Sequence, residues 1–344
     1  MPRGFLLRVS KILVTGGAGF IGSNFVRMLL LGSDHHVVNL DALTYAGNLE
    51  NLTDIERHQR YTFCKGDIAD PVEMEKVFAE HRPDVVVHFA AESHVDRSVL
   101  DATAFVRTNV IGTQVLLDKS RIYKVQRFVH VSTDEVYGSL GPWGYFTEET
   151  PMQANSPYSA SKAGSDLLVR AAVHTHHMDC VITRCSNNYG PFQFPEKLIP
   201  LMIANALEGK KLPVYGDGKN VRDWIYVTDH CDGIRAAMER GKAGEVYNFG
   251  GDAERENIFV VKEILKLLGK GEDLIGYVKD RPGHDRRYAM DSSKARATLG
   301  WTPRHTFEEG LRRTIDWYVA NKAWWERVRS GAYQQYYQQQ YGNR

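Results

Sequence analysis

Cysteine is scarce in this chain of 344 residues: it has four cysteines, and no two of them have CxxC spacing. A disulfide framework is therefore excluded, and a cysteine-based metal site is not expected. Long apolar runs are missing as well, because stretches such as Val85–Ala91 fall far short of the ~20 residues that a membrane-spanning helix needs. Near the N-terminus, Arg8 and Lys11 interrupt a short apolar stretch, which argues against a signal peptide. We therefore expect a cytoplasmic protein that does not cross a membrane.

A surplus of charge of one sign is also missing. The 43 Lys and Arg residues are balanced by 42 Asp and Glu residues, which leaves a formal net charge of +1. This balance gives no electrostatic argument for nucleic acid or an anionic membrane as a partner, and neither is expected. A metal is not expected either, since His174, His176 and His177 have no cysteine or acidic partner at a useful spacing.

The first half of the chain alternates strand-like and helical segments. The β-branched, strand-like runs are Lys11–Thr15, His36–Leu40, Tyr61–Lys65, Val85–Phe89, Phe128–Ser132 and Val181–Arg184. Segments with helical periodicity lie between them, at Ser23–Leu31, Pro71–Glu80 and Ala104–Ser120. This order predicts an α/β fold, in the form of a Rossmann-type doubly wound parallel sheet with helices on both faces.

The rhythm changes at about residue 185, which predicts a second domain. Turn-forming clusters become denser beyond this point, for example at Asn187–Phe194 and Gly216–Asn220. We expect a Rossmann domain at residues 8–185, a smaller α+β domain at 186–330 and a tail at 331–344. The segment at about 221–248 is a candidate to return to the first domain. A packing role is expected for the aromatic residues near the C-terminus, Trp317, Tyr318, Trp324 and Trp325.

A glycine-rich turn, GGAGFIG at residues 16–22, follows the first predicted strand and opens the first predicted helix. Glycines allow a tight turn and let the backbone approach a pyrophosphate, whose charge then lies at the helix N-terminus. Asp41 ends the second strand, 19 residues beyond Gly22. A carboxylate there can accept hydrogen bonds from a ribose diol and repels a 2′-phosphate, so NAD is favoured over NADP. Asp67 and Ile68, after the third strand, are candidates to lie beside the adenine ring.

A set of proton-transferring residues follows the fifth strand. Thr133, Asp134 and Glu135 lie where that strand ends, at the edge of an open α/β sheet where chemistry collects. Tyr158 and Lys162 have i, i+4 spacing, so they share one face of a helix. An ammonium group beside a phenol favours the phenolate, as does a positively charged nicotinamide ring, and Tyr158 is therefore expected to act as a base. The simpler alternatives are a solvated helix face and a solvated acidic turn.

The glycine-rich turn, Thr133 and the YxxxK pair together resemble the extended short-chain dehydrogenase/reductase family, over nearly the whole chain. The Asp134–Glu135 pair is similar to that of the 4,6-dehydratase branch, whereas sugar-nucleotide epimerases of the family generally lack it. Further matching stretches are His88–Ser98, Asp41–Asn48, Arg184–Pro200, Arg222–His230 and Asp280–Arg287.

The resemblance implies dTDP-glucose as the substrate and a hydro-lyase reaction with retained NAD. Tyr158 would take the proton of the 4-hydroxyl while hydride leaves C4, assisted by Thr133 and Lys162. Glu135 would then remove the C5 proton, and a protonated Asp134 would release the 6-hydroxyl as water. Hydride return to C6 would give a 4-keto-6-deoxy sugar, a precursor of deoxysugars such as rhamnose.

The resemblance also implies a set of binding residues and a partner. For the cofactor these are Gly16, Gly19, Phe20, Ile21, Gly22, Asp41, Ala42, Leu43, Thr44, Asp67, Ile68, Phe89, Ala90, Ala91, Ser93, Thr108, Tyr158, Lys162 and Asn188. For the substrate they are Ser93, Thr133, Asn187, Lys197, Leu198, Pro213, Val214, Tyr215, Arg222, Asn257, Arg281 and His284. A homodimer is expected through Ala104–Ser120 and Ser161–Val173.

Three rival interpretations remain open at this point. The chain could act on another sugar nucleotide, or it could be a 4-epimerase, against which the acid pair argues. It could also be an NAD-binding sensor without catalysis, which would not need a complete proton-transfer set. Single binding residues have rival roles too: Arg222 could form a surface ion pair, and His284 could be an ordinary turn residue.

Overall fold

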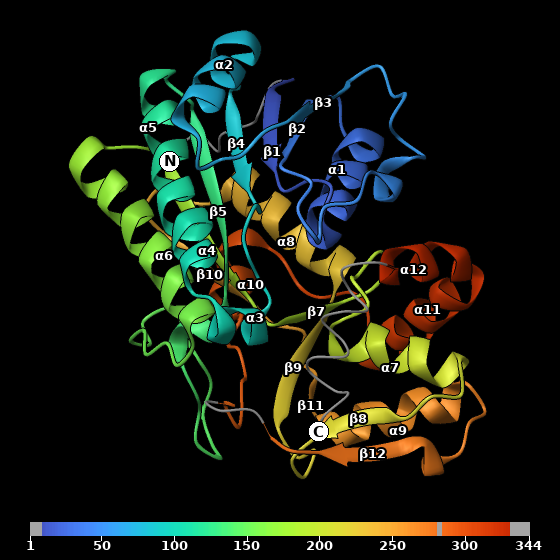
Figure 1. Ribbon diagram of the computed structural model, residues 1–344. Helices are drawn as coiled ribbons and strands as arrows, with labels where there is room; N and C mark the ends of the chain where they lie inside the picture. The colour runs from blue at the N-terminus through green and yellow to red at the C-terminus, as the bar shows by residue number, and fades with distance from the viewer. Residues whose placement is uncertain (1–8, 281–283, 331–344) are drawn as a thin grey trace.

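The computed structural model describes residues 9–280 and 284–330, and its larger lobe is built on a seven-stranded sheet (Figure 1). The strands run parallel in the order β10-β6-β5-β4-β1-β2-β3. Their bounds are Lys11–Thr15 (β1), His36–Asp41 (β2), Tyr61–Lys65 (β3), Val85–His88 (β4), Arg127–Thr133 (β5), Cys180–Cys185 (β6) and Val246–Phe249 (β10). The six predicted strands are thereby confirmed to within about one residue at each end, and so is the doubly wound α/β fold.

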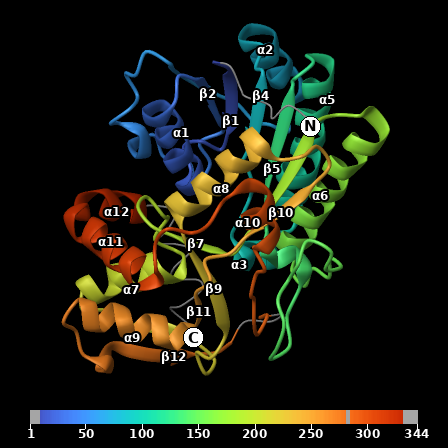
Figure 2. The same ribbon diagram turned by 180° about the vertical axis from the view of Figure 1, so that it is seen from behind.

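Helices cover both faces of this sheet (Figures 1 and 2). One face carries α1 (Phe20–Gly32) and α8 (Val227–Arg240), whose apolar side chains form one core with β1, β4 and β5. The other face carries α2 (Pro71–His81), α5 (Thr113–Ile122) and α6 (Pro157–His176), which form a second core. The strands between them are buried on both sides, as their continuous apolar runs predict.

Shorter helices connect these elements at the carboxyl edge of the sheet. Before α5 the chain forms α3, α4 and a π-helical stretch, η2. The single helix predicted at Ala104–Ser120 is thus divided among α4, η2 and α5. The bounds are Leu49–Leu52 (η1), Val95–Leu100 (α3), Thr103–Phe105 (α4), Val106–Gly112 (η2), Asp134–Tyr137 (η3) and Ser293–Leu299 (α10). A π-helical stretch is a frequent feature of functional sites, and η2 borders the pocket described below.

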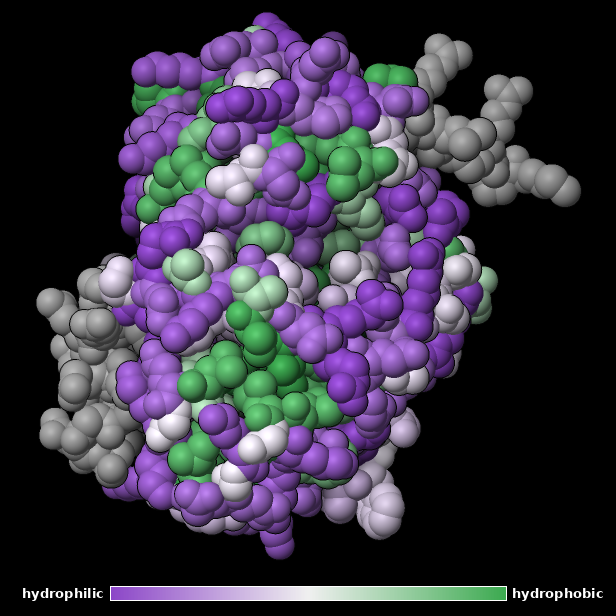
Figure 3. Space-filling view, turned by 90° about the vertical axis from the view of Figure 1, so that its right-hand side faces the viewer, coloured by the Kyte–Doolittle hydropathy of each residue, from purple (hydrophilic) through white to green (hydrophobic). Residues whose placement is uncertain are grey.

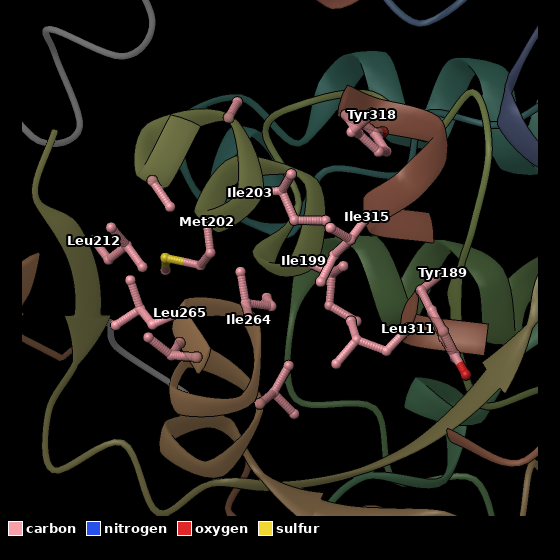
Figure 4. Packing of buried hydrophobic residues seen from close by; sticks show 14 of the residues in the cluster. Tyr189, Ile199, Met202, Ile203, Leu212, Ile264, Leu265, Leu311, Ile315 and Tyr318 are labelled. Carbon is pink, nitrogen blue, oxygen red and sulfur yellow. The ribbon is translucent and has the colours of Figure 1, made fainter. Parts of the chain in front are cut away.

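The smaller lobe combines two short sheets with helices packed around a separate apolar core (Figure 4). The side chains labelled in the figure come from β7, α7, β8, α9 and α11 and meet in its interior. The bounds of the lobe's elements are Asn187–Tyr189 (β7), Leu198–Leu207 (α7), Leu212–Tyr215 (β8), Val221–Tyr226 (β9), Glu254–Glu256 (β11), Asn257–Leu267 (α9), Glu272–Leu274 (η4), Ile275–Val278 (β12), Phe307–Ala320 (α11) and Lys322–Arg329 (α12).

The chain crosses between the lobes after β9. Strand β9 pairs with β7 and β11 in the smaller lobe, whereas α8 and β10 pack on or extend the seven-stranded sheet. The domain limits given above stay a prediction. Residues 1–8, the tail at 331–344 and Arg281 lie outside the described residues.

The described helices were compared with the length and hydropathy that a membrane span requires. Across the ranges 9–280 and 284–330, no helix is long and apolar enough to cross a bilayer. Seen from the right-hand side of Figure 1, the molecule is mainly hydrophilic, with a green apolar area in the lower half, over the smaller lobe (Figure 3).

Candidate active site

A pocket of about 480 Å³ lies at the carboxyl edge of the large sheet. It is centred where β1 lies between β2 and β4, with Thr15 opposite Leu40 on one side and His88 on the other. The chain adds β2 and β3 on one side of β1 and then places β4 on the other, so the strand order reverses here. Such a switch point is where open α/β sheets bind ligands.

The glycine-rich turn forms one wall of this pocket. Gly16 has φ +73°, and a Cβ on it would lie 2.6 Å from the Ala90 amide nitrogen. A Cβ on Gly22, in the first turn of α1, would lie 2.2 Å from the Gly16 carbonyl oxygen. Glycine at both positions therefore permits the turn and the close approach of α1 that a pyrophosphate site requires.

Asp41 holds the loop that follows β2 against this turn. Its Oδ2 accepts a hydrogen bond from the Ala18 amide at 2.9 Å, and its Oδ1 accepts one from the Leu43 amide at 2.8 Å. Burial raises the pKa of Asp41, while these two backbone hydrogen bonds lower it. Each carboxylate oxygen can accept a further hydrogen bond, so the position still fits a ribose diol.

The acid pair follows directly on β5. Thr133 caps the short helix η3, and its hydroxyl donates to Asp134 Oδ1 at 3.2 Å. Asp134 is 3% exposed, and within the described ranges its Oδ2 has no hydrogen-bond partner. Burial, and then the neighbouring Glu135, raise the pKa of Asp134 well above its ordinary value. The surroundings of Asp134 therefore favour its protonated form, which is the form that a general acid needs.

Tyr158 and Lys162 lie in the first turns of α6, which begins at Pro157 behind a Ser156 capping box. The Lys162 ammonium is buried and donates to the Val131 carbonyl at 2.9 Å, and burial lowers its pKa to about 8. Burial also raises the pKa of the Tyr158 phenol well above its ordinary value. The largest cause of this rise is desolvation, and the nearby Glu135 adds to it.

Behind these residues lies a buried polar network. His130 contacts Ser165 Oγ at 3.0 Å, and Asp166 accepts from Arg184 Nε at 2.8 Å. Burial lowers the pKa of His130 to about 4. The network orients α6 against β5 and β6, and so fixes the helix that carries Tyr158.

The pocket gathers most of the predicted residues. The five predicted catalytic residues line it, and every predicted cofactor residue does so except Leu43, whose side chain packs against the core under α1. The predicted substrate residues that line it are Ser93, Thr133, Asn187 and Lys197. Those that do not line it are Leu198, Pro213, Val214, Tyr215, Arg222, Asn257 and His284.

The substrate residues outside the pocket lie on the smaller lobe or its borders. Val214 is 2% exposed and belongs to the apolar core, so only its backbone can face a ligand. Arg222 is buried, donates to the Asp285 carbonyl at 2.9 Å and stacks 4.3 Å above the Tyr288 ring. A surface ion pair is therefore wrong for Arg222. His284 Nδ1 lies 2.6 Å from the Asp280 carboxylate.

Several pocket residues are missing from the sequence prediction. They include Tyr45, Glu92, Gln193, Phe194 and Glu196, which lie in loops, and Arg107, which lies on η2. The signals that could have found Glu196 are its place directly before Lys197 and within the family-matching stretch Arg184–Pro200. Burial raises the pKa of Glu196 to about 7. In the described part of the chain, no group of histidine, cysteine or acidic residues could hold a metal ion.

Comparison with known proteins decides the family. A sequence model described as GDP-mannose 4,6 dehydratase matches residues 13–314. The chain belongs to this GDP-mannose 4,6-dehydratase family. The resemblance to the 4,6-dehydratase branch is thereby confirmed.

Curated relatives and solved structures resemble nearly the whole chain. The dTDP-glucose 4,6-dehydratase of Xanthomonas campestris pv. campestris (strain B100) is 55% identical over 339 residues, which cover 93% of this chain and 96% of the relative. The crystal structure of DesIV, a dTDP-glucose 4,6-dehydratase from Streptomyces venezuelae with NAD and TYD bound, has a TM-score of 0.90 at 50% identity and covers 92% of this chain and 99% of DesIV. The dTDP-glucose 4,6-dehydratase of Bacillus anthracis, in complex with NAD, has a TM-score of 0.87 at 52% identity and covers 93% of this chain and 99% of that one.

In this member of the GDP-mannose 4,6-dehydratase family, the pocket fits a dinucleotide on its own geometry. The positive φ of Gly16 and the cradle that a Cβ at Gly16 or Gly22 would fill leave backbone next to a pyrophosphate position. Asp41, Tyr158 and Lys162 line the same pocket. A glycine-rich turn at a helix start and a carboxylate after the second strand are features that suit NAD.

Proposed function

We propose that this protein is a hydro-lyase that converts dTDP-glucose to dTDP-4-keto-6-deoxyglucose with retained NAD. The observation that carries the proposal is the acid pair of buried Asp134 and partly exposed Glu135, which lines the same pocket as Thr133, Tyr158 and Lys162. An oxidoreductase or an epimerase needs the last three residues but has no use for an acid pair that removes water. The names of the relatives point to the same substrate.

The first half of the reaction belongs to Tyr158. Its phenolate oxygen takes the proton of the 4-hydroxyl as the C4–H bond breaks, with Thr133 donating to the reacting oxygen and Lys162 supplying positive charge nearby. The chemistry that a bound NAD supplies is reversible hydride acceptance, together with a positive nicotinamide that favours the phenolate. The resulting 4-ketone acidifies the proton at C5.

The second half belongs to the acid pair. The Glu135 carboxylate takes the C5 proton, and the electron pair of the broken C5–H bond forms the C5–C6 double bond. The C6–O bond breaks at the same stage, and Asp134 donates its proton to the departing hydroxyl, which leaves as water. Glu135 returns its proton to C5 when hydride reaches C6, and the proton held by Tyr158 restores Asp134. The net change is loss of one water.

The roles of the binding residues belong to the same proposal. Asn187 and Asn257 fit contacts with the sugar nucleotide, because each has a buried side-chain oxygen without a hydrogen-bond partner in the described part of the chain. Arg222 and Arg281 suit the diphosphate, since a guanidinium binds phosphate oxygens in pairs. Pro213–Tyr215 on β8 would face the thymine.

Turnover tests the proposal directly. The purified protein is incubated with dTDP-glucose and, in parallel, with UDP-glucose, and the alkali-induced ultraviolet absorbance of a 4-keto-6-deoxy sugar is followed together with product mass. We expect a product lighter by one water from dTDP-glucose without added NAD, and no product from the Tyr158→Phe variant. An epimerised hexose of unchanged mass would contradict the dehydratase, and bound NAD without any product would favour a sensor.

We also propose a cytoplasmic homodimer. Support for the reducing compartment comes from the four cysteines, all of which are free thiols. Support for the dimer comes from large apolar side chains that are about half exposed or more on α3, η2, α5 and α6, namely Val99, Leu100, Val106, Ile111, Ile122 and Leu167. These helices include the two segments that the sequence predicts for the interface.

Light scattering after size-exclusion chromatography tests the dimer. We expect twice the chain mass for the parent protein and the single-chain mass for an Ile111→Glu, Leu167→Glu variant, because each subunit would bury charges in the interface. The matched control is Val319→Glu, on α11 of the other lobe and similarly exposed. The dimer is contradicted by a parent that elutes with the mass of one chain.

A further inference from the structure

Helix α12 is the last described element of the chain, yet it reaches the glycine-rich turn of the first lobe. The Trp324 indole Nε1 donates a hydrogen bond to Asn51 Oδ1 at 3.0 Å. The Asn51 side-chain nitrogen then donates to the Ala18 carbonyl at 2.9 Å. Trp324 is 7% exposed, Asn51 2% and Ala18 0%, so both hydrogen bonds are shielded from water.

Hydrogen bonds fix the peptide units on both sides of Ala18. The Ala18 amide donates to Asp41, as described above, and the Ala18 carbonyl also accepts from the Asn48 amide at 3.0 Å. Ala18 lies between Gly17 and Gly19, in the turn whose amides face a pyrophosphate. A glycine-rich turn has little stiffness of its own, so its geometry depends on contacts of this kind.

The surroundings keep Asn51 and Trp324 in place. Arg27 donates to the Asn51 carbonyl at 2.7 Å and stacks 4.6 Å from the Phe192 ring. The same ring contacts Trp324, with the centroids 5.9 Å apart. At the surface, Arg327 of α12 pairs with Glu50, but exposed ion pairs contribute little. The buried Trp324–Asn51 hydrogen bond is therefore the specific link between α12 and the turn.

We propose that Trp324 and Asn51 are positioning residues, through which α12 holds the glycine-rich turn in its NAD-binding geometry and slows the release of NAD. The inference rests on the proposed function for the identity of the ligand and for the need to retain it. A catalyst that uses the same NAD in each cycle gains from a turn that cannot relax between cycles. The link also couples retention of the cofactor to docking of the C-terminal helix.

Release of NAD tests this proposal. The holoenzyme is incubated with isotopically labelled NAD, and exchange of the bound cofactor is followed over time. A Trp324→Phe substitution keeps an aromatic ring but removes the indole N–H, and a hydrogen bond of this kind corresponds to a change of about three- to tenfold. We expect exchange to accelerate by that factor.

The matched control is Trp317→Phe, since Trp317 contacts the same Phe192 ring at 4.8 Å and no hydrogen bond from its indole is seen within the described residues. Its exchange rate should equal that of the parent.

A double variant separates positioning from packing. In an Asn51→Ala background, the Trp324→Phe substitution should add nothing to the exchange rate, because the link is already broken. The proposal is overturned if Trp324→Phe exchanges NAD at the parent rate, even with a lowered melting temperature, or if the two effects simply multiply. The readout follows bound NAD rather than turnover, so failure of the dehydration assay would leave this result standing by itself.

Discussion

At the scale of single residues, catalysis is expected to depend on the different protonation states of two adjacent carboxyl groups. Asp134 is buried, keeps one oxygen without a partner among the described residues, and has a pKa raised well above its ordinary value. Glu135 is less buried and contributes to that shift. The proposed opposite roles of these two carboxyl groups would thus follow from their different surroundings.

An Asp134→Asn variant should lose water elimination but keep its ligands. The amide cannot donate a proton as an acid does, so kcat for the 4-keto-6-deoxy product should fall about 10²- to 10⁴-fold. Isothermal titration with dTDP and the NAD content of the purified protein should match the parent. Asp232→Asn is the control, because this partly exposed carboxylate on α8 pairs with Arg235 and Arg304 and does not line the pocket. A variant with parental kcat would show that Asp134 is not the acid.

Sequence reasoning was most successful for residues that carry a motif. The glycine-rich turn, Asp41, Thr133 and the Tyr158–Lys162 pair all line one pocket, because each lies at a strand end or helix start whose position the fold dictates. It did not predict that burial raises the pKa of Tyr158, since the degree of burial is not visible in a local pattern. Phe194 and Glu196 were missed because only long-range packing brings their loop to the pocket.

At the scale of elements, the approach of α1 to the turn that precedes it determines whether NAD can bind. A Gly22→Ala substitution would place a methyl group 2.2 Å from the Gly16 carbonyl, which is backbone and cannot move alone. We expect α1 to shift outward and the NAD content after purification to drop sharply.

The same helix supplies a matched control for this prediction. At Gly32, the last residue of α1, an added Cβ would have only the end of the Arg235 side chain nearby, at 3.9 Å. Gly32→Ala should therefore retain parental NAD content and melt at or slightly above the parental temperature. Equal NAD content in the two variants would contradict the role assigned to this contact.

The elements also show where prediction from the sequence reaches its limit. The central strands could be placed within a residue, because strands buried on both faces have continuous apolar runs. The sequence could not show how residues 221–248 divide between the lobes, with β9 in one lobe and α8 and β10 in the other. This division depends on which sheet edge each segment pairs with. The π-helical turn of η2 likewise has no marker in the sequence.

At the scale of the whole molecule, buried histidines should make the fold sensitive to acid. Burial lowers the pKa of His230 to about 3, whereas an unfolded histidine has a pKa of about 6.5. Between these values the unfolded chain binds a proton that the folded chain does not. The contribution of His230 is therefore complete above pH 6.5 and is lost as the pH falls, by about 1.4 kcal/mol per pH unit.

Urea unfolding at several pH values tests this sign. Between about pH 6.5 and pH 4, the free energy of unfolding should fall less steeply with pH for His230→Gln than for the parent. The difference in slope should correspond to the uptake of about one proton on unfolding. The exposed residue His174 is the control, and His174→Gln should follow the parental slope. The lowered pKa of His130 has the same effect on the parent, on His230→Gln and on His174→Gln, so its contribution cancels when their slopes are compared. Parallel slopes for His230→Gln and the parent would contradict the prediction.

The pocket at the carboxyl edge of the seven-stranded sheet supports one overall account. In this account, a hydride leaves C4 of the sugar and returns to C6 within a single site. The most direct test is turnover of dTDP-glucose carrying deuterium at C4, without added NAD, followed by mass spectrometry and NMR of the product. The account predicts a sugar lighter by one water, with the deuterium in the C6 methyl group. Deuterium lost to solvent, or retained at C4 of an epimerised hexose, would contradict it.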